Sequence, residues 1–88
     1  MTPETRLKRL NFRASHRGTR EADMMIGGYC EARCAGWDED QIIWFEALLE
    51  EQDVDIMAWA LGAQPIPAQW QGAMIDDMRK MDFVVVPK

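Results

Sequence analysis

The stretch "WDEDQIIWFEALL", residues 37–49, carries the strongest fold signal in the sequence. Asp38 is a residue type favoured just before a helix, and Gln41 three positions later completes a capping box. Trp37 and Ile42 flank this start at the spacing of a hydrophobic staple. Apolar side chains then cover most of the helix circumference: Ile42, Ile43, Trp44, Phe45, Leu48 and Leu49. The pattern predicts a central helix with neighbours on several sides.

Two further helices are predicted upstream of this one. Thr2 before Pro3 is typical of a helix start, and the apolar residues that follow fall on one side: Leu7, Leu10 and Ala14. Gly18 interrupts that pattern, and Thr19 is expected to cap a second helix. Its apolar positions are Ala22, Met25, Ile26, Tyr29 and Cys30, and Gly36 is expected to end it in a left-handed conformation.

The Gly27-Gly28 pair lies inside this second helix. Glycine in a helix interior costs about 1 kcal/mol relative to alanine. The pair therefore indicates either a close contact with another helix or a bend.

Two helices are predicted downstream as well. Asp53 opens a short one that contains Ile56, Met57, Trp59 and Leu61, and Gly62 closes it. Residues 64–67, "QPIP", form a stiff turn. A last helix is expected from about Ala68, with Trp70, Met74, Met78 and Met81 on one side. The tail at residues 82–88 is expected to be extended, and it can pack back on the helices, hang free or add to a partner.

Five short helices with brief connections predict an all-α fold, a small antiparallel bundle formed by one domain over residues 1–88. No apolar run approaches the roughly 20 residues of a membrane-spanning helix, and no secretory or transit signal begins the chain. We therefore expect a cytoplasmic protein without membrane insertion. Cys30 and Cys34 are interpreted as half-buried packing residues rather than a redox or metal pair.

No set of residues predicts catalysis. His16 is the only histidine, it lies among arginines, and no residues assemble with it into a catalytic triad. The acidic clusters at residues 38–40 and 76–77 fall at helix starts or on polar faces, where solvated charge is the simpler explanation. The sequence is interpreted as that of a non-enzyme.

Charge is distributed unevenly along the chain. Residues 1–20 carry six basic side chains against Glu4, a net charge of +5, whereas residues 21–88 carry four basic and fourteen acidic side chains, a net charge of −10. Such a basic arm can steer docking onto an acidic protein surface or contact nucleic-acid phosphates. It can equally pack beside the acidic helices of the same chain.

The turn "HRGTRE", residues 16–21, is the strongest candidate for a contact site. Gly18 lets the chain turn and lets another surface approach the backbone, because it has no Cβ. Arg17 and Glu21 are four residues apart, but a pair in this orientation contributes at most about 0.5 kcal/mol. A guanidinium and a carboxylate beside bare backbone favour a docking surface over a purely structural helix start.

The run "RGTREAD", residues 17–23, resembles the RGxxE motif, followed by an aspartate, of the SdhE or succinate dehydrogenase assembly factor family of flavinylation factors. The resemblance continues in "MMIGGYCEA" and "LLEEQDVDIMAWALG", and upstream in "KRLNFRASH", so that it covers about Lys8 to Gly62. Ala22 departs from the larger residue expected between the glutamate and the aspartate.

The resemblance implies a compact helical assembly factor. Such factors bind the flavoprotein subunit of succinate dehydrogenase, and in bacteria also that of fumarate reductase, and promote covalent attachment of FAD to a histidine of that subunit. By the same resemblance, the contact surface comprises Arg17, Gly18 and Glu21, supported by Asp23 and extended by His16, Arg20 and Arg13. No stably bound cofactor of its own is expected, and the protein is expected to be a monomer when not bound to a partner.

The alternative hypothesis is a small nucleic-acid-associated or toxin-antitoxin-type regulator that uses the basic arm. Phosphate binding falls steeply with ionic strength, and the acidic remainder of the chain opposes it. The preferred interpretation therefore includes no nucleic-acid partner.

Overall fold

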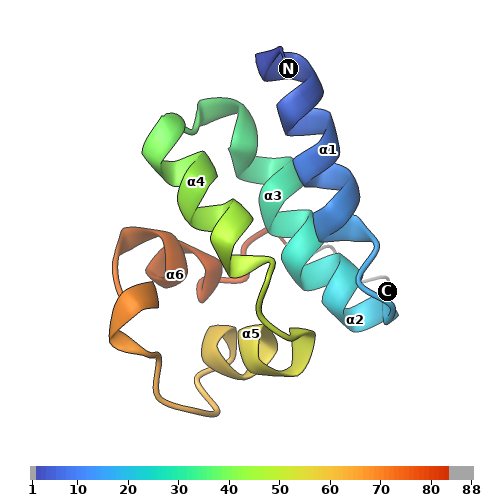
Figure 1. Ribbon diagram of the computed structural model, residues 1–88. Coiled ribbons are helices and arrows are strands. Elements are labelled where there is room, and N and C mark those ends of the chain that lie inside the picture. The colour runs from blue at the N-terminus through green and yellow to red at the C-terminus, as the bar shows by residue number, and fades with distance from the viewer. Residues whose placement is uncertain (1, 84–88) are drawn as a thin grey trace.

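Helices make up all the regular structure of residues 2–83, the part of the chain that the computed structural model describes (Figure 1). The elements in chain order are α1 (Pro3–Ser15), α2 (Arg20–Ala22), a π-helical segment (Asp23–Gly27), α3 (Gly28–Arg33), a 3-10 turn (Cys34–Gly36), α4 (Glu39–Leu48), α5 (Asp53–Ala60), a second 3-10 turn (Ala68–Trp70) and α6 (Ala73–Met78). The predicted all-α class is confirmed.

The predicted second helix is a continuous rod over residues 20–33, made of α2, the π-helical segment and α3. In Figure 1 this rod lies beside α1 and runs in the opposite direction, with α4 on its other side and α5 and α6 below. Taking the rod as one unit leaves five α-helical units among the described residues. Residues 84–88, most of the predicted extended tail, lie outside the described residues.

Gly27 marks the point where the rod touches α1. A Cβ placed on it would lie 2.6 Å from Ser15 Oγ, 2.8 Å from Ser15 Cα and 3.1 Å from the Ala14 carbonyl oxygen. The backbones could not remain this close with any side chain at position 27. Of the two readings of the glycine pair, the close helix contact is confirmed for Gly27, and the π-helical segment ends at the same residue.

Gly27→Ala is expected to lower the free energy of unfolding by about 1 to 3 kcal/mol, because the added methyl group forces the two helices apart. Gly28→Ala is the matched control, since its Cβ would meet Phe83 at an ordinary contact distance of 3.5 Å. Urea unfolding of the two variants measures the difference. Equal stability of the two proteins would contradict the close contact at position 27.

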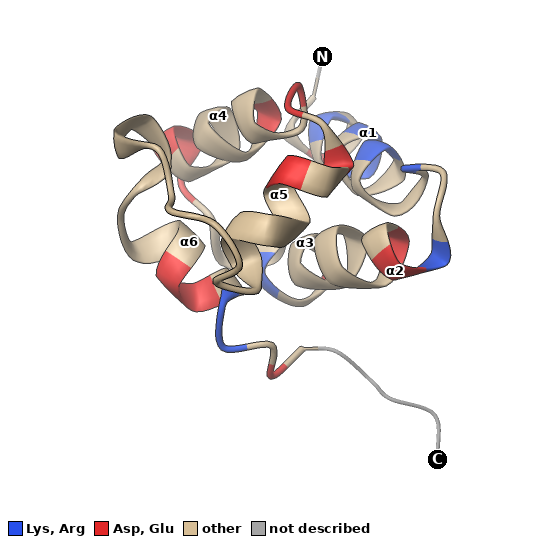
Figure 2. Ribbon diagram, turned by 90° about the horizontal axis from the view of Figure 1, so that it is seen from below, with Lys and Arg blue, Asp and Glu red and all other residues tan. Residues whose placement is uncertain are grey.

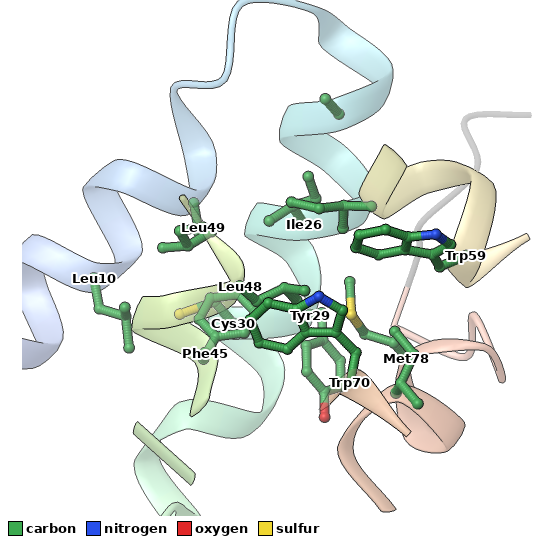
Figure 3. Packing of buried hydrophobic residues seen from close by; sticks show 14 of the residues in the cluster. Leu10, Ile26, Tyr29, Cys30, Phe45, Leu48, Leu49, Trp59, Trp70 and Met78 are labelled. Carbon is green, nitrogen blue, oxygen red and sulfur yellow. The ribbon is translucent and has the colours of Figure 1, made fainter. Parts of the chain in front are cut away.

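Tyr29, on α3, is the centre of the core (Figure 3). Its ring lies 5.7 Å from that of Trp37, 6.0 Å from Phe45 and 5.3 Å from Phe83, measured between centroids. Its hydroxyl donates a hydrogen bond to the Met74 carbonyl oxygen at 3.2 Å. Burial raises the pKa of this phenol. The rod, rather than residues 39–48, therefore organises the core.

The expectation for the helix at residues 39–48 was right about its start and wrong about its surroundings. Asp38 and Gln41 form the predicted capping box. Phe45 is fully buried, but Ile43 is 50% exposed, so α4 lies at one side of the core instead of being enclosed by it. An apolar residue on every face of a helix does not reveal which face is left in solvent.

Two of three predicted helix boundaries differ from the sequence-based expectations. Gly36 ends a 3-10 turn without a positive φ, so it is not the expected left-handed stop. Gly62, by contrast, has φ +75° and closes α5 as predicted, although Leu61 before it is exposed rather than part of the apolar side. The predicted helix from Ala68 is split, because Gly72 adopts φ +147° between the second 3-10 turn and α6.

The described start of the tail packs back on the helices. Asp82 accepts a hydrogen bond from Arg33 at 2.6 Å, and the Phe83 ring packs against Tyr29. Cys30 and Cys34 are both buried rather than half-buried, and they are not joined in a disulfide.

Candidate functional site

The turn between α1 and α2 presents bare backbone at Gly18. This residue has φ +113°, and a Cβ placed on it would meet no heavy atom within 4 Å among the described residues other than its two chain neighbours. Two hydrogen bonds hold the turn from below: Thr19 Oγ1 accepts from the Ala22 amide at 3.2 Å, and Asp23 Oδ1 accepts from the Arg17 amide at 2.6 Å. Gly18 is therefore an exposed, conformationally fixed point that another surface can approach closely.

Arg17 lies beneath this turn rather than on it. Its Nε donates to Asp53 Oδ1 at 2.6 Å, and one terminal nitrogen donates to the carbonyl oxygens of Leu49 at 2.9 Å and Glu51 at 3.1 Å. Only 13% of the side chain is exposed. We call this set of bonds the Arg17 clasp. It fastens the turn to the end of α4 and the start of α5.

The clasp corrects one sequence-based interpretation. Arg17 was considered as a partner for Glu21 four residues away, but its ion pair is with Asp53. A guanidinium that donates to two carbonyl oxygens beyond a helix C-terminus is well suited to satisfy groups the helix leaves unpaired. Structural support is therefore a sufficient reason for an arginine at position 17.

The other predicted contact residues surround the turn at its surface. His16, Arg20 and Glu21 are exposed, and Asp23 is partly buried below them. Arg13 pairs with Glu50 at 3.1 Å. The structure thus gathers His16 and residues 18–21 into one exposed patch, with Asp23 and Arg17 as supports.

Sequence reasoning missed two contributors to this region. Asp53 was interpreted as the residue that opens a helix and as part of the family pattern, yet it is also the ionic partner of Arg17. Phe12 was not singled out, yet its ring stacks on His16 with centroids 4.0 Å apart. The separation of four residues between Phe12 and His16 was a usable signal, since such pairs adjoin on a helix. No local signal joins Arg17 to Asp53.

Half of the basic residues in the arm form ion pairs within the molecule. Figure 2 shows lysine and arginine along α1 and acidic residues on the elements around it. Arg6 pairs with Glu39 at 2.6 Å and with Glu46 at 2.7 Å, and these two carboxylates raise the pKa of its guanidinium. Arg13 and Arg17 also form ion pairs, so three of the six basic residues in the arm are neutralised within the molecule. The nucleic-acid hypothesis is not favoured.

The Arg6 pair predicts a pH-dependent contribution to stability. Hydrogen bonds from Arg6 hold the pKa of the Glu46 carboxyl below its usual value. A carboxyl with a lowered folded-state pKa stabilises the fold above its unfolded pKa, and this contribution is lost as the pH falls through the folded pKa. Glu46→Gln should therefore lower the free energy of unfolding at about pH 7 and have less effect at about pH 3. Urea unfolding at both pH values tests this, and a pH-independent effect would contradict it.

Two observations concern metal binding and thiol chemistry among the described residues. No three histidine, cysteine, aspartate or glutamate side chains among residues 2–83 are grouped closely enough to hold a metal ion. Burial raises the pKa of the Cys30 thiol, which disfavours the reactive thiolate. No helix in this part of the chain has the length and apolar character needed to cross a membrane.

Fold and site together define a small all-α protein whose best candidate site is a docking surface rather than a catalytic pocket. The chain belongs to the family described as the flavinator of succinate dehydrogenase, whose sequence model matches residues 8–82. This confirms the family resemblance, and the match extends past Gly62, the last residue of the motifs that carried the resemblance.

Curated relatives agree with this family. The chain is 37% identical over 73 residues to the FAD assembly factor SdhE of Acetobacter pasteurianus. The aligned region covers 83% of this chain and 67% of that protein. It is 33% identical over 67 residues to the mitochondrial succinate dehydrogenase assembly factor 2 of Mycosarcoma maydis, covering 76% of this chain and 28% of that protein. These relatives are named as assembly factors, in agreement with the prediction of a non-enzymatic protein.

Proposed function

We propose that this protein binds the flavoprotein subunit of succinate dehydrogenase through residues 16–21 and promotes covalent attachment of FAD to that subunit. The observation that carries the proposal is Gly18, whose exposed left-handed backbone is held in place by Asp23 and the Arg17 clasp. Membership of the flavinator family supplies the class of partner.

The surface suits protein docking for physical reasons. Exposed backbone at Gly18 offers hydrogen-bonding groups without a side chain in the way, and His16, Arg20 and Glu21 surround it with polar groups. Because Arg17 is held inside the molecule, we assign it to supporting the turn and assign Gly18 and Glu21 to the direct contact. Arg13 and Arg20 extend the contact at its edge.

Binding promotes the reaction by shifting the partner's conformations. A protein that binds one conformation of the flavoprotein more tightly than another raises the population of that conformation. The favoured conformation would hold FAD and the acceptor histidine in reacting geometry, so that the flavoprotein performs its own chemistry. FAD is thus attached to the partner and is not carried by this chain, and in bacteria that contain fumarate reductase its flavoprotein subunit is a second partner.

Co-expression tests the proposal. The succinate dehydrogenase flavoprotein subunit is produced with a tagged form of this protein, in a host that lacks its own assembly factor, and the tag is used for purification. We expect the flavoprotein to copurify in equimolar amount. Recovery of this protein without the flavoprotein would contradict the proposed partner.

The cytoplasmic location stays a prediction.

A further inference from the structure

Two of the large exposed apolar side chains lie beside the docking turn. The described residues expose four such side chains: Phe12, Ile43, Val54 and Leu61. Phe12 is 63% exposed and stacks on His16, while Val54 is 68% exposed and lines an open hollow together with His16. His16 thus stacks on Phe12 of α1 and lines the same hollow as Val54 of α5, whose other lining residues, Arg17, Gln52 and Asp53, are polar. We call the two apolar side chains and the imidazole ring next to them, Phe12, Val54 and His16, the apolar strip.

The apolar strip is held in a fixed shape. His16 Nδ1 lies 2.8 Å from the Phe12 carbonyl oxygen, and the two rings are nearly parallel, at 18°. Below the hollow, the Arg17 clasp fixes the first residue of α5, Asp53, to the turn. The strip therefore presents a preformed surface, which reduces the entropy lost when a partner binds.

We propose that the apolar strip is a second anchor for the same flavoprotein that docks at Gly18, and that it contacts an apolar patch on that subunit. The inference rests on the proposed function. It is supported by continuity, because His16 belongs both to the strip and to the turn. Protein interfaces commonly combine an apolar centre with a polar rim, and here Arg20, Glu21 and Gln52 supply polar groups at the edge.

A second copy of this chain is a less suitable occupant. A symmetric dimer formed through the strip would place its partner over the adjoining turn and would cover Gly18. Dimer formation and flavoprotein binding would then exclude each other. The strip is therefore assigned to the flavoprotein, and self-association becomes an outcome that the experiment can detect.

The test compares four serine variants of the full chain: Phe12→Ser and Val54→Ser in the strip, with Ile43→Ser and Leu61→Ser as controls that lose comparably exposed side chains elsewhere. Affinity for the purified flavoprotein subunit is measured by calorimetry, and molar mass by light scattering. We expect about a 10-fold loss of affinity for each strip variant and less than a 2-fold change for each control. All proteins are expected to be monomeric without the flavoprotein.

The outcomes separate this inference from the proposed function. If Phe12→Ser and Val54→Ser bind as tightly as the unaltered protein while Gly18→Arg does not bind, the turn is the docking site and the apolar strip is not an anchor. If the unaltered protein is a dimer that the strip variants dissociate, the occupant is a second copy. If the unaltered protein does not bind the flavoprotein, the proposed function fails, and this inference fails with it.

Discussion

Gly18→Arg is expected to reduce affinity for the succinate dehydrogenase flavoprotein by about 100-fold while leaving the protein folded. The new side chain would project from a position that has open space around it, so the fold accommodates its volume. The same side chain would stand where the partner approaches the backbone. The positive φ adds a strain of about 1 to 2 kcal/mol, which is smaller than the typical stability of a domain.

Gly72→Arg provides the matched control. Gly72 also has a positive φ, at +147°, and a Cβ placed there would likewise meet no heavy atom within 4 Å among the described residues other than its two chain neighbours. It precedes α6, in a part of the chain that does not contribute to the turn. Both variants therefore add the same charge at a glycine with a positive φ, and they differ only in their position on the protein surface. Calorimetric titration of both against the flavoprotein is the measurement, and equal losses of affinity would contradict the docking site.

Arg17→Gln is expected to lower the free energy of unfolding by about 2 to 3 kcal/mol. The substitution leaves Asp53 without its ionic partner and the carbonyl oxygens of Leu49 and Glu51 without their guanidinium donor. It should also weaken flavoprotein binding, because the turn loses its attachment to α4 and α5. Urea unfolding and calorimetry on the same preparation measure both effects.

Two comparisons isolate the clasp. Arg20→Gln removes an exposed arginine three residues away and should change stability by less than about 0.5 kcal/mol. Asp53→Asn combined with Arg17→Gln should cost less than the sum of the two single substitutions, because both remove the same ion pair. If Arg17→Gln unfolds at the same urea concentration as the unaltered protein, the clasp does not stabilise the fold, and Arg17 returns to the set of direct contacts.

Features encoded by neighbouring residues could be predicted from the sequence. The capping box of Asp38 and Gln41 depends on residues three positions apart, and the residue types alone specify it. The cost of glycine in a helix likewise indicated a close contact or a bend at the Gly27-Gly28 pair, and the contact is found at Gly27. The contact of Gly27 with Ser15 depends on how α1 packs against the rod, and no local sequence pattern predicts that packing.

The predictions that failed depend on features that residue spacing along a helix does not encode. Trp70 and Met74 have helical spacing, but the backbone freedom of Gly72 allows a break between them that spacing does not reveal. The turn at Gly18 is exposed, as the sequence suggested, whereas the ion pair of Arg17 with Asp53 was not foreseen. This pair joins residues far apart in the chain, and ion pairs of this kind follow from the tertiary fold.

Covalent flavin on the partner tests the central claim most directly. The flavoprotein subunit is produced in a host without an assembly factor, alone or with the unaltered protein, Gly18→Arg or Gly72→Arg, and its flavin fluorescence is read after denaturing electrophoresis. We predict strong fluorescence with the unaltered protein and with Gly72→Arg, and little with Gly18→Arg or with the flavoprotein alone. Equal fluorescence in all four samples, or none in any, would contradict a role for this protein in FAD attachment through the turn at Gly18.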